Sequence, residues 1–304
     1  NPGNNFFAYC VHNQFFITKF ATKKNTTAMI FPEFLRQGDL VTIVSPSGAI
    51  DGEVVEQAAA SIRQLGYSVK IAEHAKGKHH RFSATDEERL ADLQSALDDS
   101  QTRAIICARG GYGMTRIVDR LDFSKFIENP KFVVGFSDIT ALHAAILTKA
   151  KCCSIHGQMS KAFVGYDATL DKKDAGNPEV AESVEELLNL LTGVRRRQTY
   201  FSYNQRSRVA KEKVKGRLFG GNLSLIYALR GTELDITKQS GILYIEDIGE
   251  RMYSIDRMMQ NLRMSGVFGR IKGLVVGKFT DTDIDSSFGS IEDLMFEVTN
   301  GYDF

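Results

Sequence analysis

The sequence predicts an α/β protein with two units: an open parallel sheet, then a smaller, β-rich α/β unit. From about residue 39, short β-branched strands alternate with amphipathic helices, which is the pattern of right-handed βαβ units. A polar, basic segment at 177–215 interrupts this alternation before a second set of strands and helices begins. The length of 304 residues also fits two domains of ordinary size.

The first unit is expected to cover residues 29–176. It opens with the strand LVTIV (40–44), which ends in the turn SPSG (45–48). A helix follows at 53–65, and Gly66 is the residue type that most readily adopts the left-handed conformation after a helix. These segments form the first strand–helix step of a parallel sheet.

The next elements continue the same alternation. After the strand YSVKI (67–71), Thr85 and Glu88 have the spacing of a capping box, which predicts the start of a second helix. Two continuous apolar runs, at 104–108 and 131–135, are typical of strands buried on both faces of a parallel sheet. We therefore expect a flavodoxin-like open parallel sheet.

Residues 177–215 are interpreted as a connection between the units, because a helix at 180–191 leads into the solvated basic run at 195–197. The second unit, residues 216–304, is predicted to hold strands and an amphipathic helix. That helix has apolar residues at i, i+3, i+4 and i+7, which predicts a stripe that faces the core; they are Ile255, Met258, Met259 and Leu262.

Both ends of the chain differ from the rest. Residues 1–28 have neither a helical nor an alternating period and lack the unbroken apolar stretch of a signal peptide. We interpret them as an extension outside the fold, with Met29 as the natural first residue. At the other end, Ser290 caps a helix and the chain then stops as if entering a strand, so the second unit is expected to be incomplete.

Composition narrows the class of protein. The 38 basic residues almost balance the 37 acidic ones, which gives no electrostatic reason to expect nucleic acid or an anionic membrane as a partner. No apolar run approaches the ~18 residues of a spanning helix. The four cysteines lack Cys-x-x-Cys spacing, so neither a disulfide framework nor a zinc site is indicated. We expect a soluble, cytoplasmic protein.

A glycine-rich loop, RGGYG (109–113), follows a buried strand and precedes the predicted helix MTRIVDRL. Glycine lets backbone N–H groups approach a ligand, so the loop could hold a phosphate or the oxyanion of an acyl-transfer intermediate. It matches neither G-x-G-x-x-G nor a P-loop. The alternative is a tight turn that binds nothing.

Ser137 and Asp138 lie where the strand 131–135 gives way to a helix predicted at 139–149. A serine at such a point is presented at the carboxyl edge of the sheet, where α/β folds place ligands. The G-x-S-x-G form of the nucleophile elbow is absent, and the alternative is that one of the two residues only caps the helix.

Acidic residues follow the apolar strand 242–245, beginning with Glu246 and Asp247. A carboxylate at a strand end can orient a catalytic histidine, although a solvated turn or a helix cap would show the same pattern.

No histidine provides a convincing base for Ser137. His12 lies in the extension, and three others lie in a polar loop (His74, His79 and His80). His143 points away from Ser137, and His156, which could reach the edge of the sheet, is interpreted with it as structural. None has metal-ligand spacing.

Taken in order, the segments resemble the LD-carboxypeptidase family of serine peptidases, which includes murein tetrapeptide carboxypeptidases and microcin-immunity peptidases. The resemblance covers roughly residues 30–304. The matching segments are GDLVTIVSPSG (38–48), ARGGYG (108–113), VVGFSDITALHAA (133–145), IHGQM (155–159), GRLFGGNLSLIYALRGT (216–232), LYIEDIGERMYSIDRMMQNLRMSG (243–266) and KGLVVGKF (272–279). Each is weak alone, and the ordered set is specific.

The resemblance implies a Ser-Glu-His triad with Ser137 as nucleophile and Glu246 as the acid. It implies an oxyanion hole from the amides of Asp138 and one glycine of the loop, best Gly111. The family's histidine belongs to a Gly-His segment that would follow residue 304, and no residue here matches it. The sequence as given should therefore bind its substrate without turning it over.

The implied reaction releases the terminal D-alanine of a murein tetrapeptide by hydrolysis of an L,D-peptide bond, in cytoplasmic cell-wall recycling. No metal or organic cofactor is required. Arg109 is a candidate partner for the substrate's terminal carboxylate, or else forms a structural ion pair, and Tyr112 is a candidate substrate contact. The resemblance also implies a homodimer, with no nucleic-acid or membrane partner.

Three alternatives stay open. One is a same-family peptidase that cleaves a peptide–nucleotide antibiotic, differing only in the loops around the site. Another is a non-catalytic α/β module whose glycine loop binds a small anion. The third is a naturally short, inactive chain.

Overall fold

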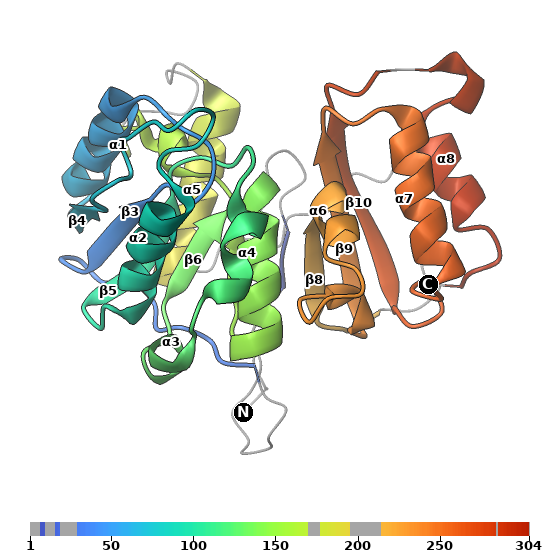
Figure 1. Cartoon of the computed structure of the whole chain (residues 1–304), viewed down its shortest axis with the longest axis horizontal. Coiled ribbons are helices and arrows are strands. Elements are labelled where there is room, and N and C mark those ends of the chain that lie inside the picture. Colours follow the sequence, from blue (N-terminus) through green and yellow to red (C-terminus); the bar gives the residue numbers. More distant parts are fainter. Residues whose placement is uncertain are drawn as a thin grey trace. The chain divides into compact units, whose positions relative to one another are not determined.

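The structure is a computed structural model that describes residues 7–9, 16–18, 29–169, 177–194, 214–283 and 285–303. Contacts divide the chain into two compact units, Asn1–Tyr200 and Phe201–Phe304 (Figure 1). Of the predicted extension at 1–28, only two short antiparallel strands are described, β1 (Phe7–Tyr9) and β2 (Phe16–Thr18). The basic run at 195–197 lies outside the described residues.

The first unit is built on a five-stranded parallel sheet. Strand β3 (Leu40–Val44) lies between β4 (Ser68–Ile71) and β5 (Thr102–Cys107), and the sheet continues through β6 (Phe132–Gly135) to β7 (Ile155–His156). The order β4-β3-β5-β6-β7 is the flavodoxin-like order, which confirms the predicted fold class. Its topological switch point lies between β3 and β5, where doubly wound sheets bind their ligands.

Helices cover both faces of this sheet, with α2 (Asp86–Asp98), α3 (Ser124–Glu128) and α4 (Thr140–Ala145) on the side toward the viewer in Figure 1. Helices α1 (Gly52–Gln64) and α5 (Pro178–Thr192) contribute to a buried core on the opposite side. Helix α5 falls within the segment predicted to be a connection. That part of the segment belongs to the first unit, because its buried apolar residues pack in the core of that unit; they are Val184, Leu187 and Leu191.

Local signals in the sequence set several boundaries. The capping box of α2 is present, with the Thr85 hydroxyl accepting from the Glu88 amide and the Glu88 carboxylate accepting from the Thr85 amide. Gly66, after α1, has a φ of 90°. Both features agree with the predicted helix ends.

Two predicted helices differ from the structure. The segment MTRIVDRL forms two 3-10 turns, Met114–Arg116 and Val118–Arg120, because Ile117 between them leaves the helical region (φ −128°) and is fully buried. The helix predicted at 139–149 is split into a 3-10 turn, Ser137–Ile139, then α4, and a π-helical segment, Ile146–Ala150. Burial of apolar side chains, rather than continuous helix hydrogen bonding, sets these paths.

Arg89, on α2, is a buried cation that connects the loops at the switch point. Its Nη1 donates to the carbonyl of Pro46, after β3, and to the carbonyl of Gly113, after β5 (3.1 Å). Its Nε donates to Ala84 O at 3.3 Å and its Nη2 to the carboxylate of Asp86. With the residue only 1% exposed, these bonds satisfy a charge that water cannot reach.

The second unit contains a smaller parallel sheet, in which β9 (Ile242–Ile248) lies between β8 (Leu218–Asn222) and β10 (Gly273–Thr280). A short helix, α6 (Leu223–Ala228), follows β8 directly. The sheet order confirms a second α/β unit, smaller than the first.

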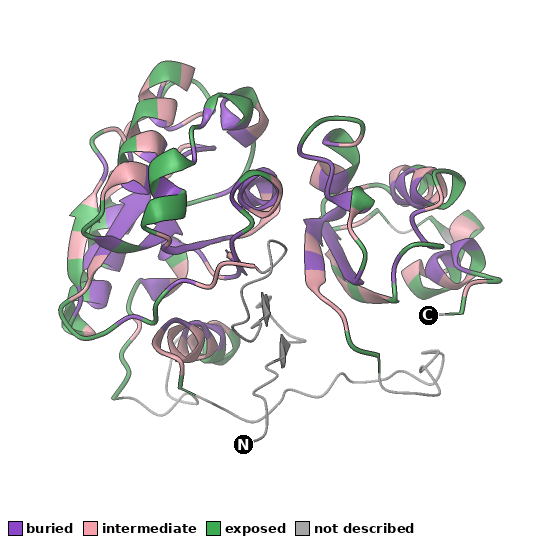
Figure 2. Ribbon diagram, turned by 90° about the horizontal axis from the view of Figure 1, so that it is seen from below, coloured by how far each residue is buried: buried purple, intermediate pink, exposed green. Residues whose placement is uncertain are grey.

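Helices α7 (Met252–Met264) and α8 (Ile291–Val298) complete the second unit. The predicted stripe of α7 is buried as expected; its residues are Ile255, Met258, Met259 and Leu262. Figure 2 shows this pattern in each unit: buried residues line the central strands, and exposed residues lie on the outer faces of the helices. In the described parts of the chain, no helix is both long and apolar enough to cross a membrane.

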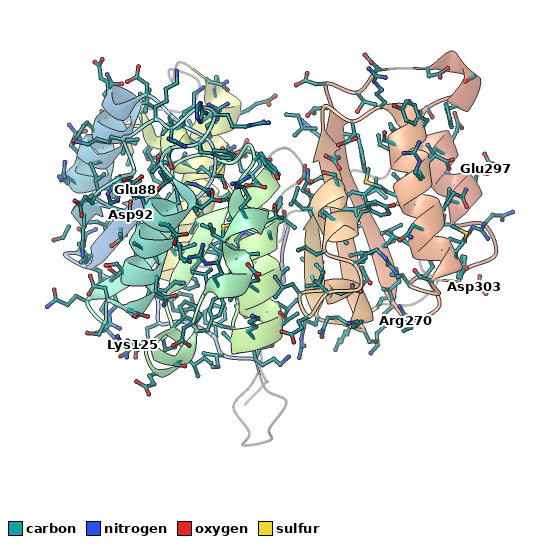
Figure 3. The ribbon with its side chains drawn as sticks, viewed as in Figure 1. Glu88, Asp92, Lys125, Arg270, Glu297 and Asp303 are labelled. Carbon is teal, nitrogen blue, oxygen red and sulfur yellow. The ribbon has the colours of Figure 1, made fainter. Side chains whose placement is uncertain are left out.

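Many charged side chains extend outward from the helices (Figure 3). On α2, Asp92 accepts from the amide and ring of His74 (2.8 and 2.9 Å). On α3, Lys125 forms an exposed ion pair with Asp98 at 3.2 Å. The exposed pair of Lys125 contributes little stability, in contrast to the buried Arg89.

Replacing Arg89 by Met should lower the free energy of unfolding by about 3 kcal/mol, because the carbonyl of Pro46 would lose its donor and that of Gly113 would keep only the amide of Arg116. Urea denaturation followed by circular dichroism measures this change. The matched control is Arg120→Met, which removes an exposed pair with Glu87 and should cost less than about 0.5 kcal/mol. Equal stability of the two variants would refute the structural role of Arg89.

Candidate active site

Ser137 has a strained backbone at the end of β6. Its φ is 59°, in the left-handed region, which costs a residue other than glycine about 1 kcal/mol. It begins a 3-10 turn that leads into α4. A serine held in this way at a strand–turn–helix junction has the backbone of a nucleophile elbow, although the flanking glycines of G-x-S-x-G are absent.

The glycine loop packs directly against this serine. A Cβ atom at Gly110 would lie 3.1 Å from Ser137 Cβ, 3.3 Å from Ser137 Oγ and 3.2 Å from the carbonyl oxygen of Phe136. Only a residue without a side chain fits there without displacing its neighbours. The next residue, Gly111, has a φ of 100°. The structure thus brings together two segments that the sequence only suggested separately.

Asp138 joins the loop to the serine turn. Its buried carboxylate accepts from the amide of Met114 through Oδ2 (2.8 Å), and Oδ1 has no hydrogen-bond partner among the described residues. Neither Asp138 nor Ser137 caps the following turn or helix through its side chain. The alternative that one of them only caps a helix is therefore wrong.

The turn after β3 adds a third strand end to the site. The amide of Gly48 donates to the carbonyl oxygen of Gly110 at 3.0 Å. A Cβ atom at Gly48 would lie 2.9 Å from that same oxygen, so bare backbone on both sides allows the two loops to meet. The ends of β3, β5 and β6 converge here, as expected at a switch point.

His143 forms a hydrogen bond to the backbone just before the serine turn. Its Nε2 forms a 2.8 Å hydrogen bond with the carbonyl oxygen of Gly135, and its ring centroid lies 6.0 Å from that of His156. Burial, with a smaller effect of His156, lowers the pKa of His143 to about 3. A neutral, buried imidazole that bonds a backbone carbonyl is structural, as the sequence suggested.

In the second unit, Glu246 and Asp247 lie inside strand β9, each 2% exposed. The alternative of a solvated turn at these residues is therefore wrong. Glu246 is paired in register with Asn222, the last residue of β8. Buried carboxylates at the end of a strand cost free energy unless they are hydrogen-bonded, so their hydrogen-bond partners show how this cost is offset.

Asp247 has three such partners. Its carboxylate accepts from Asn222 Nδ2 and from the amide of Ser224 (both 2.8 Å), and from the amide of Ile248 (2.9 Å). The Asn222 side chain also caps α6 by accepting from the amide of Leu225 (3.2 Å). Burial still outweighs these bonds and raises the pKa of Asp247 to about 6.

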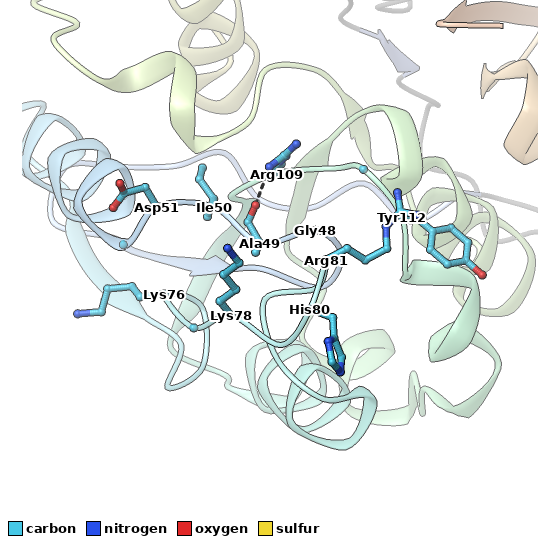
Figure 4. A pocket seen from close by; sticks show the side chains of 13 residues that line it. Gly48, Ala49, Ile50, Asp51, Lys76, Lys78, His80, Arg81, Arg109 and Tyr112 are labelled. Atoms are coloured by element: carbon cyan, nitrogen blue, oxygen red, sulfur yellow. Dashed lines mark hydrogen bonds between the residues drawn. The ribbon is translucent and has the colours of Figure 1, made fainter.

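A cavity of about 630 Å³ opens at the switch point of the first unit, lined by residues 48–52, 76–78, 80, 81, 109, 111 and 112 (Figure 4). Arg109 donates through Nη1 to the carbonyl oxygen of Ala49 at 2.7 Å, so its partner there is backbone rather than the carboxylate of an ion pair. Tyr112 is 42% exposed, and the Arg81 guanidinium carbon lies 5.2 Å from the centre of its ring.

Sequence reasoning missed several residues at these sites. The basic residues of the loop 76–81 line the cavity, and the signal was their position after the second strand of the sheet. Arg89 gave no local signal, because its partners are up to 43 residues away. Among the described residues, no three His, Cys, Asp or Glu side chains are placed to hold a metal ion.

Comparisons with known proteins agree with this architecture. The model of the LD-carboxypeptidase N-terminal domain matches residues 41–157, and that of the LD-carboxypeptidase C-terminal domain matches residues 215–303. Together these ranges cover more than half of the chain, which therefore belongs to the LD-carboxypeptidase family.

Two relatives extend the comparison. The chain is 33% identical over 252 residues to a probable murein peptide carboxypeptidase of Bacillus subtilis, covering 82% of this chain and 74% of that protein. It is 29% identical to the murein tetrapeptide carboxypeptidase of Pseudomonas aeruginosa, covering 79% and 76%. Both relatives are named as carboxypeptidases.

Solved structures share the fold. A muramoyltetrapeptide carboxypeptidase from Oxalobacter formigenes is 29% identical, with a TM-score of 0.65 over 87% of this chain and 81% of that one. The microcin C7 self-immunity protein MccF, in complex with aspartyl sulfamoyl adenosine, has a TM-score of 0.75 over 90% and 87%. With 21% identity, the second likeness is one of fold.

The raised pKa of Asp247 should appear in the pH dependence of stability. The native state keeps this proton up to about pH 6, whereas the unfolded chain releases it near 3.8. Within that window the native state binds more protons, so the contribution of Asp247 to stability falls as pH rises. The unfolding free energy of the wild type minus that of Asp247→Asn should decrease by about 2 kcal/mol between pH 4 and 7.

Urea denaturation of both proteins at several pH values measures this difference. Any constant loss of hydrogen bonds in the Asn variant cancels, because only the change with pH matters. A difference that stays flat or grows from pH 4 to 7 would contradict the raised pKa.

Proposed function

We propose that the protein is a serine carboxypeptidase that hydrolyses the L,D-peptide bond of cytoplasmic murein tetrapeptide and releases its terminal D-alanine during cell-wall recycling. The observation that carries the proposal is the left-handed Ser137 at the end of β6, with the glycine loop packed against it. It occurs in a chain of the LD-carboxypeptidase family whose relatives are named murein peptide carboxypeptidases.

In this mechanism Ser137 attacks the carbonyl carbon of the scissile bond. The amides of Gly111 and Asp138 stabilise the oxyanion. The Asp138 carboxylate supports this role because its bond to the amide of Met114 holds the serine turn and the end of the glycine loop together. The D-alanine amine leaves, and water then hydrolyses the acyl-enzyme on Ser137.

Glu246 is proposed to orient the histidine that takes the Ser137 proton. Its burial supports the role, since the acid of a Ser-His-acid triad works as a buried, unsolvated acceptor. The family places that histidine in a Gly-His segment after residue 304. Residues 1–304 alone should therefore bind the tetrapeptide but release D-alanine far more slowly than a protein that carries the segment.

Arg109 and Tyr112 are proposed to contact the substrate, because both line the cavity beside the glycine loop. The chemistry needs no cofactor, since the nucleophile, oxyanion donors and acid are all protein groups. We also propose a homodimer in the cytoplasm, in keeping with the family resemblance.

A same-family peptidase for peptide–nucleotides is the second candidate. It is favoured by the fold likeness to MccF, which is described in complexes with aspartyl sulfamoyl adenosine and glutamyl sulfamoyl guanosine. Parallel assays with tetrapeptide and with aspartyl sulfamoyl adenosine separate the two. Cleavage of only the nucleotide conjugate would replace the murein proposal.

Ser137→Ala in the full-length protein should reduce D-alanine release from tetrapeptide by about 10⁴-fold or more, because the acyl-enzyme can no longer form. Chromatographic quantification of D-alanine measures the rate, and circular dichroism checks folding. Ser68→Ala, an exposed serine on β4, is the matched control with unchanged rate. Wild-type activity in Ser137→Ala would overturn the nucleophile assignment.

Gly110→Ala should lower kcat by about tenfold or more with little change in folding. The added Cβ, 3.1 Å from Ser137 Cβ, displaces the nucleophile from its reacting geometry, to which rates are sensitive. Gly269→Ala is the control, since its nearest contact would be an ordinary 3.8 Å. An unchanged kcat in Gly110→Ala would show that the loop does not set the position of Ser137.

A further inference from the structure

The cavity beside the glycine loop is much more basic than the chain as a whole. The full sequence has a formal net charge of only +1. The cavity lining, in contrast, contains one acidic residue, Asp51, and four basic ones: Lys76, Lys78, Arg81 and Arg109. A cleft lined by one sign of charge concentrates ligands of the other sign, so the cavity is suited to an anionic group.

Two of these cations are placed to meet a ligand. Figure 4 shows Lys78 and Arg109 reaching toward Ala49 from opposite sides. Among the described residues Lys78 has no ion pair, and Arg109 uses only one N–H of its guanidinium on the carbonyl of Ala49. Lys76 is different, because its amine lies 2.6 Å from the carboxylate of Glu56.

Asp51, the acidic residue of the lining, already has a hydrogen-bond partner. Asp51 caps α1, and its carboxylate accepts from the amide of Glu53 at 2.9 Å. Helix α1 begins at Gly52, which also lines the cavity, so the positive end of a 13-residue helix adds to the basic side chains. The net field inside the cavity therefore favours an anion.

The glycine loop connects this cavity to the nucleophile. Gly111 lines the cavity, and its neighbour Gly110 packs against Ser137, with a Cβ position 3.3 Å from Oγ. In a peptide substrate the terminal carboxylate lies one residue beyond the last peptide bond, so a group that binds it must lie close to the nucleophile, as this cavity does through the glycine loop.

We propose that this cavity binds the C-terminal carboxylate of the residue that is released, with Lys78 and Arg109 as the cations that hold it. The inference rests on the proposed function and adds the reason for exopeptidase specificity. An internal peptide bond would bring a neutral amide to the cavity and leave both cations unpaired. The free carboxylate of the last residue satisfies them with charge-assisted hydrogen bonds.

The test compares murein tetrapeptide with the same peptide ending in D-alanine amide, using the full-length protein. The wild type should cleave the amide with a kcat/KM about 100-fold lower, from the loss of two charge-assisted contacts at about tenfold each. Lys78→Met and Arg109→Gln should each raise KM for the acid by about tenfold, and the double variant should no longer distinguish acid from amide.

Lys125→Met is the matched control. It removes an exposed lysine on α3 that is paired with Asp98 and does not line the cavity (Figure 3), and it should behave like the wild type. Lys78→Glu provides a second variant at an exposed position; because it reverses the charge, it should reduce the preference for the acid more than Lys78→Met does.

The outcomes separate the two proposals. Equal cleavage of acid and amide by the wild type would overturn the carboxylate site and leave the proposed function intact. No cleavage of either peptide would overturn the function itself. Discrimination that survives in the folded double variant would place the carboxylate elsewhere and also overturn this inference.

Discussion

The buried guanidinium of Arg89 is the interaction on which the carboxyl edge of the first sheet depends. It donates to the loop after β3 at Pro46 and to the end of the glycine loop at Gly113, while it remains attached to α2. Loops that leave adjacent strands at a switch point diverge toward opposite faces of the sheet. A cation with several donors, held in the core, keeps these two loops together where water would otherwise separate them.

The other contacts of the site depend on these hydrogen bonds of Arg89. The glycine loop, fixed at Gly113, can pack its bare backbone on Ser137, and the Asp138 carboxylate closes the contact from the other side through Met114. On its outer side the same loop forms a wall of the basic cavity. One short segment thus serves the nucleophile on one face and the ligand cavity on the other.

The sequence was sufficient where the signal was local. The alternation of strands and helices and the Thr85 capping box were predictable, and so were a glycine loop and a serine at the ends of two strands, although not their contact. The 3-10 turns after Gly113 were not, because burial of Ile117 overrides helical propensity. The burial of Glu246 and Asp247 was not predictable either, because acidic residues at the end of a strand give the same sequence pattern whether the strand is buried or exposed to solvent. Arg89 and the basic cavity arise from contacts between distant segments, which periodicity does not record.

The pKa of about 3 at His143 has a consequence for acid tolerance. Its imidazole stays neutral from mildly acidic to alkaline conditions. The ring that bonds the carbonyl of Gly135, next to the turn that carries Ser137, therefore keeps one protonation state over that range. The acid limb of a rate profile must then originate in other groups. A loss of rate in mildly acidic solution therefore cannot be assigned to charging of the His143 ring.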